Sequence, residues 1–325
     1  MRDEIMSSNK KNIYIYLGKV ILVTLLIVLF VRCFLFESYS VSSSQMETSL
    51  QKGDKILINK TAYGIRMPIT IFSVPFFFDT YSTALQAPYK RLLSRDISQN
   101  DVVLFNNPAE ADKPLDKRSL ILCRCVALPG DTIQLTDGIF TVNNNTYTAS
   151  PNTIYKYRIT ASAGNENIEG IIDKSGIQAD GVDRIGDTLF MEMSRYEAYL
   201  LSKNLPDSTE LQIYSTDTLT GYKFAIPCEG QTIELSENNL IIYRQIILLE
   251  QEGNDVFFDK GILIIDGIKQ GTYTFRDSYY WMLSDNTENA LDSRTLGFIP
   301  FKSVIGKAQF VWYSPDEERR LSVVE

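Results

Sequence analysis

The 325-residue sequence contains no histidine. This absence excludes the Ser-His-Asp and Cys-His mechanisms of hydrolysis, and it also excludes zinc sites built on imidazole ligands. Any hydrolase made from this chain would need a different general base. Lysine is the obvious one, because burial lowers the pKa of its amine until the amine can accept a proton at neutral pH.

Basic residues are also in short supply. Lys and Arg total 32 against 40 Asp and Glu, which gives a formal net charge of -8. Nucleic-acid binding needs a clustered basic face, so we expect no nucleic-acid partner. Hydrophobic residues make up 44% of the chain, enough for one large core or two modest ones, and the 17 Phe, 18 Tyr and 11 Pro favour strands and turns.

Only four cysteines are present. Cys123 and Cys125 alternate along a predicted strand, where neighbours on the same face rarely have disulfide geometry. Cys33 lies in an apolar segment, and Cys228 stands alone. We therefore expect free thiols that are buried or partly buried.

One long apolar run lies near the amino terminus, from Tyr14 to Phe36. It is long enough to cross a bilayer, which takes ~20 residues. Bulky Phe34, Phe36 and Tyr39 stand where a signal peptide would need small residues, so we expect an uncleaved anchor. Basic residues ahead of the run predict that residues 1–12 are cytoplasmic and that the chain after the anchor is exported.

A second apolar stretch, Ile69–Phe78, is interrupted by proline and cannot span a bilayer. Two interpretations remain open. The stretch is either an ordinary core segment or a loop that dips into the outer leaflet and contacts membrane lipid. The second interpretation would hold the functional site beside the membrane surface.

The remaining chain favours antiparallel strands. The segment Asp101–Phe105 has the pattern of a short buried strand. Two hairpins are predicted where turn residues follow apolar runs, one at Gly138–Val142 with Asn143–Asn145 and one at Gly261–Ile265 with Asp266–Gly267.

The fold class expected is mainly β, with an antiparallel-sheet core, an inserted smaller β-rich domain and one amino-terminal transmembrane helix. The expected segments are a cytoplasmic amino terminus (1–12), a transmembrane anchor (13–36), the first part of the core (37–154), an inserted β-rich region (155–255), the second part of the core (256–314) and a charged tail (315–325).

Four separated motifs occur in order: YSVSSSQMETSLQKGD, DVVLF, DKRSLILCRCVALPGD and SDNTENALDSR. They resemble four features of bacterial type I signal peptidases, also called leader peptidases. In the same order, these are the nucleophile strand, a buried strand, the general-base strand and the loop that contains the orienting serine. The resemblance covers nearly the whole chain. It implies the signal-peptidase core, a Ser/Lys catalytic dyad, no cofactor, and exported proteins cleaved after Ala-x-Ala as substrates.

The residues that would carry this chemistry are replaced. By the resemblance, the nucleophile position is Gln45, the general-base position is Cys123, and the serine that orients the lysine amine is Ala290. These changes belong together, because a desolvated lysine is only an electrostatic cost once its serine is gone. The orienting hydroxyl then has no partner either. We therefore predict a protein that does not catalyse cleavage.

Most of the family residues around these positions are retained in this chain. The resemblance implies that Ser43 supplies a donor to the oxyanion hole and that Met46 lies in the same groove. It also matches a set of residues that brace the loop: Asp285, Asn286, Asn289, Asp292, Ser293 and Arg294. Ser284 stands where the family has a glycine. The loop lacks the glycine and the bidentate glutamate of a calcium site, so no metal is expected.

An active signal peptidase with displaced catalytic residues is the alternative. Ser43 shares the strand face of Gln45 but lies ~6–7 Å back along the strand. Cys123 has no evident base to form a thiolate. Because losing the nucleophile of a serine protease costs on the order of 10⁶ in kcat, we favour a binding role at the bacterial cytoplasmic membrane. The expected partners are signal peptides or exported proteins in an extended-peptide groove, membrane lipid and an active paralogue.

Overall fold

The computed structural model describes residues 2–47, 49–73, 81–136, 139–161, 168–175, 177, 180–206, 208–215, 221–259, 261–288 and 290–324. Its strands are antiparallel throughout the seven sheets of this part of the chain, apart from one isolated parallel bridge. The expected mainly β class is confirmed.

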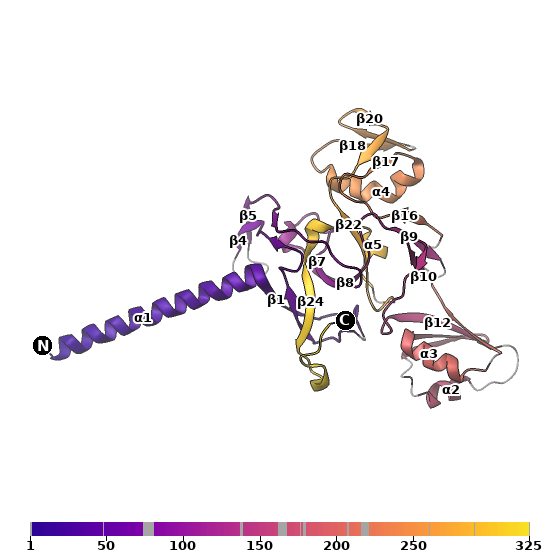
Figure 1. The fold of residues 1–325 in the computed structure, drawn as a ribbon, viewed down its shortest axis with the longest axis horizontal. Coiled ribbons are helices and arrows are strands. Elements are labelled where there is room, and N and C mark those ends of the chain that lie inside the picture. Colours follow the sequence, from indigo (N-terminus) through magenta and orange to yellow (C-terminus); the bar gives the residue numbers. More distant parts are fainter. Residues whose placement is uncertain are drawn as a thin grey trace.

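A long helix stands apart from the rest of the molecule (Figure 1). This helix, α1, spans Arg2–Phe30 and continues into a π-helical turn, η1, at Val31–Leu35. Within the described residues, Tyr14–Leu35 is the one helical stretch long and apolar enough to cross a bilayer. It coincides with the anchor expected from the sequence.

Lys60 fastens the end of the helix to the core. Its amine donates to the backbone oxygen of Arg32 at 2.9 Å and pairs with Glu37 at 2.7 Å. Carbonyl groups at a helix end lack intrahelical partners, so this contact satisfies one of them. The chain then enters the core directly as a strand.

A seven-stranded sheet forms the core, in the order β1-β2-β24-β7-β8-β22-β23. Its strands are β1 (Phe36–Ser40), β2 (Lys55–Asn59), β7 (Val102–Asn106), β8 (Leu120–Ala127), β22 (Tyr279–Leu283), β23 (Ile299–Pro300) and β24 (Val304–Tyr313). The two central strands β7 and β8 are buried on both faces, which explains their uninterrupted apolar runs. Val103 and Cys123 face one apolar cluster, whereas Leu104 and Leu122 face another.

The remaining small elements surround this sheet. They are β3 (Ile65–Arg66) paired with β6 (Arg91–Leu92), β4 (Thr70–Ser73) paired with β5 (Tyr81–Gln86), β9 (Thr132–Thr136), β10 (Ile139–Val142), β11 (Asn145–Thr146), β16 (Lys223–Ala225), α5 (Ser293–Leu296), η2 (Leu115–Lys117), η3 (Phe301–Ser303) and η4 (Glu317–Arg319). Strands β9, β10, β11 and β16 form their own sheet.

Both predicted hairpin turns are confirmed. In the β10–β11 hairpin, Asn143 and Asn144 have φ of 52° and 65°. In the second hairpin, Asp266 and Gly267 have φ of 50° and 77°. Left-handed backbone at both central residues suits the twist of a two-residue hairpin, and Asn, Asp and Gly tolerate it best.

The first part of the inserted region is a split βαβ module. Its elements are β12 (Ile154–Ala161), α2 (Ile168–Lys174), β13 (Asp180–Ile185), β14 (Thr188–Ser194), α3 (Arg195–Asn204) and β15 (Thr209–Ile213). The sheet order β13-β14-β12-β15 and this β-α-β-β-α-β succession define the ferredoxin-like arrangement. The helices cover one face of the sheet through an apolar cluster that includes Ile159, Met191 and Leu201.

A second lobe projects from the core between β16 and β22 (Figure 1). Strands β17 (Thr232–Glu234) and β21 (Thr272–Thr274) close its base, and beyond them lie α4 (Glu237–Glu250), β18 (Val256–Asp259), β19 (Ile262–Ile265) and β20 (Ile268–Gln270). The boundary expected between residues 255 and 256 falls inside this lobe. Residues 155–255 thus contribute most of the split βαβ module, strand β16 of the β9–β11 sheet and part of this lobe, and both the module and the lobe contain helix.

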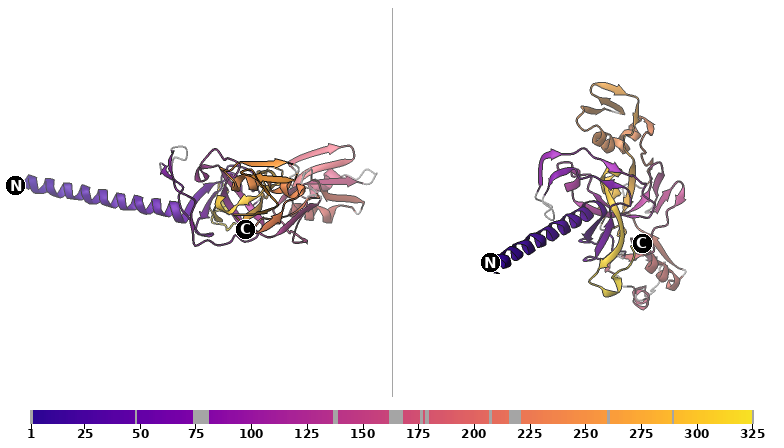
Figure 2. Two further views of the ribbon diagram at one scale, coloured as in Figure 1. Left: turned by 90° about the horizontal axis from the view of Figure 1, so that it is seen from above. Right: turned by 60° about the vertical axis from the view of Figure 1, so that its left-hand side comes forward.

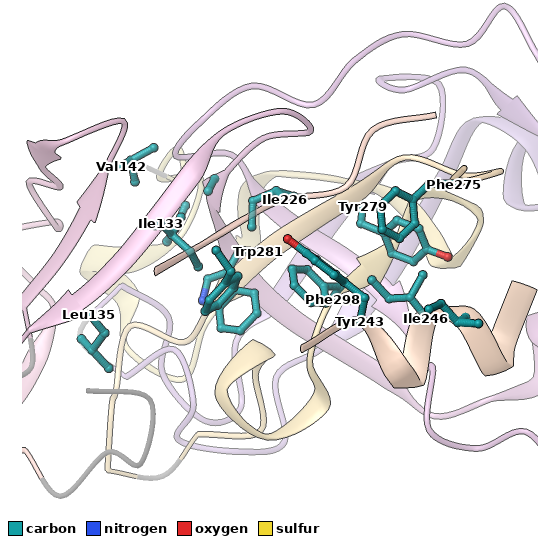
Figure 3. Packing of buried hydrophobic residues seen from close by; sticks show 14 of the residues in the cluster. Ile133, Leu135, Val142, Ile226, Tyr243, Ile246, Phe275, Tyr279, Trp281 and Phe298 are labelled. Atoms are coloured by element: carbon teal, nitrogen blue, oxygen red, sulfur yellow. The ribbon is translucent and has the colours of Figure 1, made fainter. Parts of the chain in front are cut away.

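Aromatic side chains join the lobe to the core (Figure 3). Phe298 lies 5.4 Å from Trp281 and 5.6 Å from Tyr243 between ring centroids. At the end of α4, buried Glu250 accepts hydrogen bonds from the hydroxyls of Tyr273 and Tyr279. Its charge is thus satisfied, which burial requires.

The tail after Ser314 folds back onto the molecule. Val323 forms a bridge with Phe310 of β24, and Arg319 donates to the backbone oxygen of Ser49 and pairs with Asp54 at 3.0 Å. The charged tail expected from the sequence is therefore ordered through residue 324. It contacts the segment that follows Gln45.

Candidate functional site

One loop, residues 284–292 after β22, connects the positions predicted from the sequence. The backbone oxygen of Gln45 accepts a hydrogen bond from Asn286 N at 2.9 Å. The sulfur of Cys123 lies 3.7 Å from Ser284 Oγ and 3.8 Å from the backbone oxygen of Leu291. Among the residues described, no hydrogen bond joins the Gln45 side chain to Cys123. The two positions are linked instead through their separate contacts with this loop.

The thiol of Cys123 is fully enclosed, with 0% of the residue exposed. Burial raises the pKa of this thiol well above its usual value, and the charge of Asp292 adds to the effect. The thiol, not the thiolate, is therefore present at neutral pH. A cysteine in this state is a poor nucleophile.

Ser284 is the residue whose importance the sequence analysis missed. It is 2% exposed, and its hydroxyl meets the Cys123 sulfur. Its backbone N–H donates to Asp292 Oδ2 at 3.0 Å, which fixes its place in the loop. The sequence did contain a signal for this contact. Cys123 is shorter than the lysine of the family, and Ser284 is longer than the glycine of the family.

A buried ion pair holds the loop to β8. Arg124 donates from Nε to Asp285 Oδ1 at 2.8 Å and from Nη2 to Asp285 Oδ2 at 2.6 Å. Ser49 Oγ donates to the same carboxylate at 2.5 Å. A two-point Arg–carboxylate contact fixes orientation as well as distance. The contact therefore locks β8, the loop and the segment after Gln45 together.

Further contacts agree with the bracing role expected of the loop residues. Asp292 Oδ1 accepts from the backbone N–H of Arg294 at 3.0 Å, and the Arg294 side chain returns to Asp292 Oδ2 at 3.0 Å and to the backbone oxygen of Thr287 at 2.9 Å. Ser293 Oγ accepts from Met282 N at 2.8 Å. Asn289 lies outside the described residues.

The other predicted site residues have different surroundings. Ser43 is exposed, whereas Met46 is 1% exposed and packs in the core cluster with Leu50. Ala290 lines a pocket together with Ser284 and Asp285 of the same loop. Burial raises the pKa of the Tyr39 hydroxyl, which bonds Ser42 and lies close enough to Cys123 to interact electrostatically. Tyr39 was not predicted, and nothing in its sequence pattern marks it.

Two strand edges are open beside this site. β1 is the last strand of the seven-stranded sheet, and β22 pairs with β8 only from Arg124 to Ala127. Leu120–Cys123 therefore has no strand partner on that side within the described part of the chain. Tyr39 of β1 packs on the same apolar cluster as Leu120 and Leu122, so the two edges converge.

An apolar anchor, an antiparallel core and motif strands that meet at one loop define a membrane-anchored protein built on a peptidase framework. The sequence profile of the family described as signal peptidase, peptidase S26, matches residues 14–208 and 226–313. The chain belongs to this family, as the motifs predicted.

Individual relatives are distant. A signal peptidase I of Buchnera aphidicola subsp. Baizongia pistaciae is 25% identical over 288 residues, covering 89% of this chain and 73% of the relative. One from Haemophilus influenzae is 24% identical over 295 residues, covering 90% and 68%. One from Pseudomonas aeruginosa reaches 35% identity over 128 residues, covering 39% and 37%.

Proposed function

We propose that this protein binds exported chains at a signal-peptidase groove and does not cleave them. The observation that carries the proposal is the contact between the Cys123 sulfur and the Ser284 hydroxyl, 3.7 Å apart in a buried site. A lysine amine at position 123 would need that space, and the hydroxyl of Ser284 occupies it. With Gln45 at the nucleophile position, neither half of a Ser/Lys dyad is present.

The two open strand edges support the binding role. An extended peptide can hydrogen-bond along an unpaired edge while its alternate side chains enter pockets. The edges of β1 and Leu120–Cys123 converge on an apolar cluster that would receive small apolar side chains. Ser43 at the exposed rim is the proposed remaining donor of the oxyanion site, and Met46 supports the groove from beneath.

The anchor supports a place in the bacterial cytoplasmic membrane, with residues 1–12 in the cytoplasm and the core outside. The proposed partners are signal peptides or exported proteins, and an active paralogue that would do the cutting. A second protein of the same organism with Ser, Lys and Ser at the positions of Gln45, Cys123 and Ala290 would fit that partner.

The alternative, an active peptidase with displaced residues, makes a distinct prediction. Ser43 has no hydrogen bond to a base in the described residues, and Cys123 is held as a thiol. If the alternative holds, Ser43→Ala or alkylation at Cys123 must abolish cleavage. Either result would identify the nucleophile.

The test uses the full chain in detergent micelles and a fluorescent peptide with an Ala-x-Ala site. We expect the peptide to bind, measured by anisotropy, with no cleavage product after long incubation by mass spectrometry. The control is a peptide with aspartate at both alanine positions, which should bind at least about tenfold more weakly because the apolar cluster cannot accept a charged side chain. Cleavage of the first peptide would refute the non-catalytic role, and equal binding of both peptides would refute the groove.

A further inference from the structure

A cavity of about 450 Å³ lies at the seam between the core and the split βαβ module. Arg124 and Val126 of β8 line it, and these alternate along the strand with Cys123 and Cys125. Alternate residues of a strand point to opposite faces. The Cys123 sulfur therefore lies on the other face of β8, but Ser284 and Ala290 also line the cavity, so it adjoins the predicted site through the 284–292 loop.

Three tyrosines are among the residues that line the cavity. Tyr147, Tyr155 and Tyr214 all line it, with apolar Leu135 and Ile213 beside them. The Tyr147 hydroxyl is held by Asn100 Oδ1 at 2.5 Å, and the Tyr214 ring packs edge-on against another ring of its sheet at 4.9 Å. The rings are thus fixed before any ligand arrives. Aromatic faces attract cations and pack well against aliphatic stems.

The cationic side chains that line the cavity are already engaged. Arg124 is bonded at two points to Asp285, and Arg294 is bonded to Asp292. Lys156 lies 3.8 Å from the carboxylate of Asp183. An anionic ligand would have to compete with these carboxylates.

Glu288, an exposed residue that also lines the cavity, is different. Its carboxylate has no ion pair or hydrogen bond with any residue that the structure describes. Desolvation against the cavity wall raises the pKa of this carboxyl, and the nearby charge of Glu192 raises it further, although Lys156 and Arg294 act in the opposite direction. A cation beside Glu288 would relieve the repulsion between these two carboxylates.

We propose that this cavity binds an ammonium or guanidinium group on an aliphatic stem, with Glu288 as its counter-ion and the tyrosines around the stem. A lysine or arginine side chain of a polypeptide and a free diamine carry the same chemistry. The proposal does not depend on the groove function, because Glu288 and these tyrosines are not part of the two open strand edges.

Calorimetry on the full chain in micelles tests the site. The probes are N-acetyl-lysinamide and N-acetyl-norleucinamide, which share an aliphatic stem and differ in charge. We expect the lysine probe to bind at least about tenfold more tightly, since a cation gains both the carboxylate and the ring faces. Equal affinity, or tighter binding of N-acetyl-glutamate, would overturn the proposal without any variant being needed.

Variants locate the site. Glu288→Gln should bring the lysine probe to the affinity of the norleucine probe, whereas Glu252→Gln, an exposed residue outside the cavity, should leave it unchanged. Unchanged lysine binding in Glu288→Gln would refute this location. An acetylated Gly-Lys-Gly amide that binds more tightly than 1,5-diaminopentane would support a polypeptide ligand, and the reverse order would support a free diamine.

Discussion

At the scale of single residues, the predicted site is distinguished by the catalytic residue types that it lacks. The resemblance predicts that Gln45, Cys123 and Ala290 replace the members of one catalytic unit. The structure adds Ser284, whose hydroxyl fills space at the Cys123 sulfur. The change from glycine to Ser284 is visible in the sequence, but its contact with Cys123 is not, because the two residues are 161 positions apart.

This contact changes how activity should be rebuilt. A triple variant would carry the nucleophile, base and orienting hydroxyl of the family: Gln45→Ser, Cys123→Lys and Ala290→Ser. We expect this triple variant to stay inactive and to unfold more easily, because the longer lysine side chain meets the hydroxyl of Ser284 at a fully buried position. Adding Ser284→Gly should give measurable cleavage of an Ala-x-Ala peptide.

Recovery should nevertheless be partial, since a displacement of ~1 Å at a catalytic group can cost 10²-fold. The matched control is the fourfold variant with glutamine kept at position 45, which lacks only the nucleophile. Equal activity with and without Ser284→Gly would show that Ser284 does not block the base.

Thiol reactivity gives a second prediction at this scale. Cys123 and Cys125 are both fully buried, and burial raises the pKa of each thiol. Neither should react with iodoacetamide in the folded protein from about pH 7 to about pH 9, a range in which an ordinary exposed thiol becomes a thiolate. Peptide mass spectrometry should find both labelled only after unfolding in guanidinium. Labelling of Cys123 in the native protein would contradict the enclosed site.

At the scale of elements, sequence patterns predicted strands better than they predicted helices of the inserted region. The DVVLF strand and both hairpins followed from apolar runs and turn residues. Helix α3 also had a local signal, because Ser194 and Glu197 form a capping box in which each side chain accepts the other's backbone N–H. The order of the strands in the split βαβ module had no such signal, since it depends on long-range pairing.

The ordered tail provides a test at this scale. Asp54 is 0% exposed, and Arg319 is its partner in an ion pair of 3.0 Å. Arg319→Gln should lower the free energy of unfolding by about 1–3 kcal/mol, because it leaves a buried carboxylate without its cation. Urea unfolding followed by circular dichroism measures the loss.

Glu317→Gln is the control, because the Glu317 side chain is 82% exposed and pairs with Arg320 at the surface of the same tail. It should change stability by no more than about 0.5 kcal/mol. Equal effects of the two substitutions would mean that the tail does not brace the segment after Gln45.

At the scale of the whole molecule, anchor, core and appended units project in different directions (Figure 2). The helix leaves the core on one side, and the lobe and the split βαβ module extend away from it. The β4–β5 hairpin lies close to the helix exit in all three views (Figures 1 and 2). This arrangement favours the second interpretation of the Ile69–Phe78 stretch, in which it faces the membrane.

The described part of that stretch exposes two large apolar side chains, Ile71 at 52% and Phe72 at 57%. Residues 74–80 lie outside the described residues, so these two carry the test. A truncated protein of residues 37–325 should sediment with liposomes, and Ile71→Asp with Phe72→Asp should weaken this binding at least about tenfold, because both side chains lose their burial in lipid. Circular dichroism should show the same folded signal for both proteins.

The matched control places the same two charges far from the anchor, as Phe257→Asp with Ile268→Asp in the projecting lobe, where both side chains are also exposed. Liposome binding should then be unchanged, because the lobe points away from the helix exit. A truncated protein that never binds liposomes would make the hairpin an ordinary surface segment. Equal loss in both pairs would mean that added negative charge, and not the hairpin, sets the affinity for the membrane.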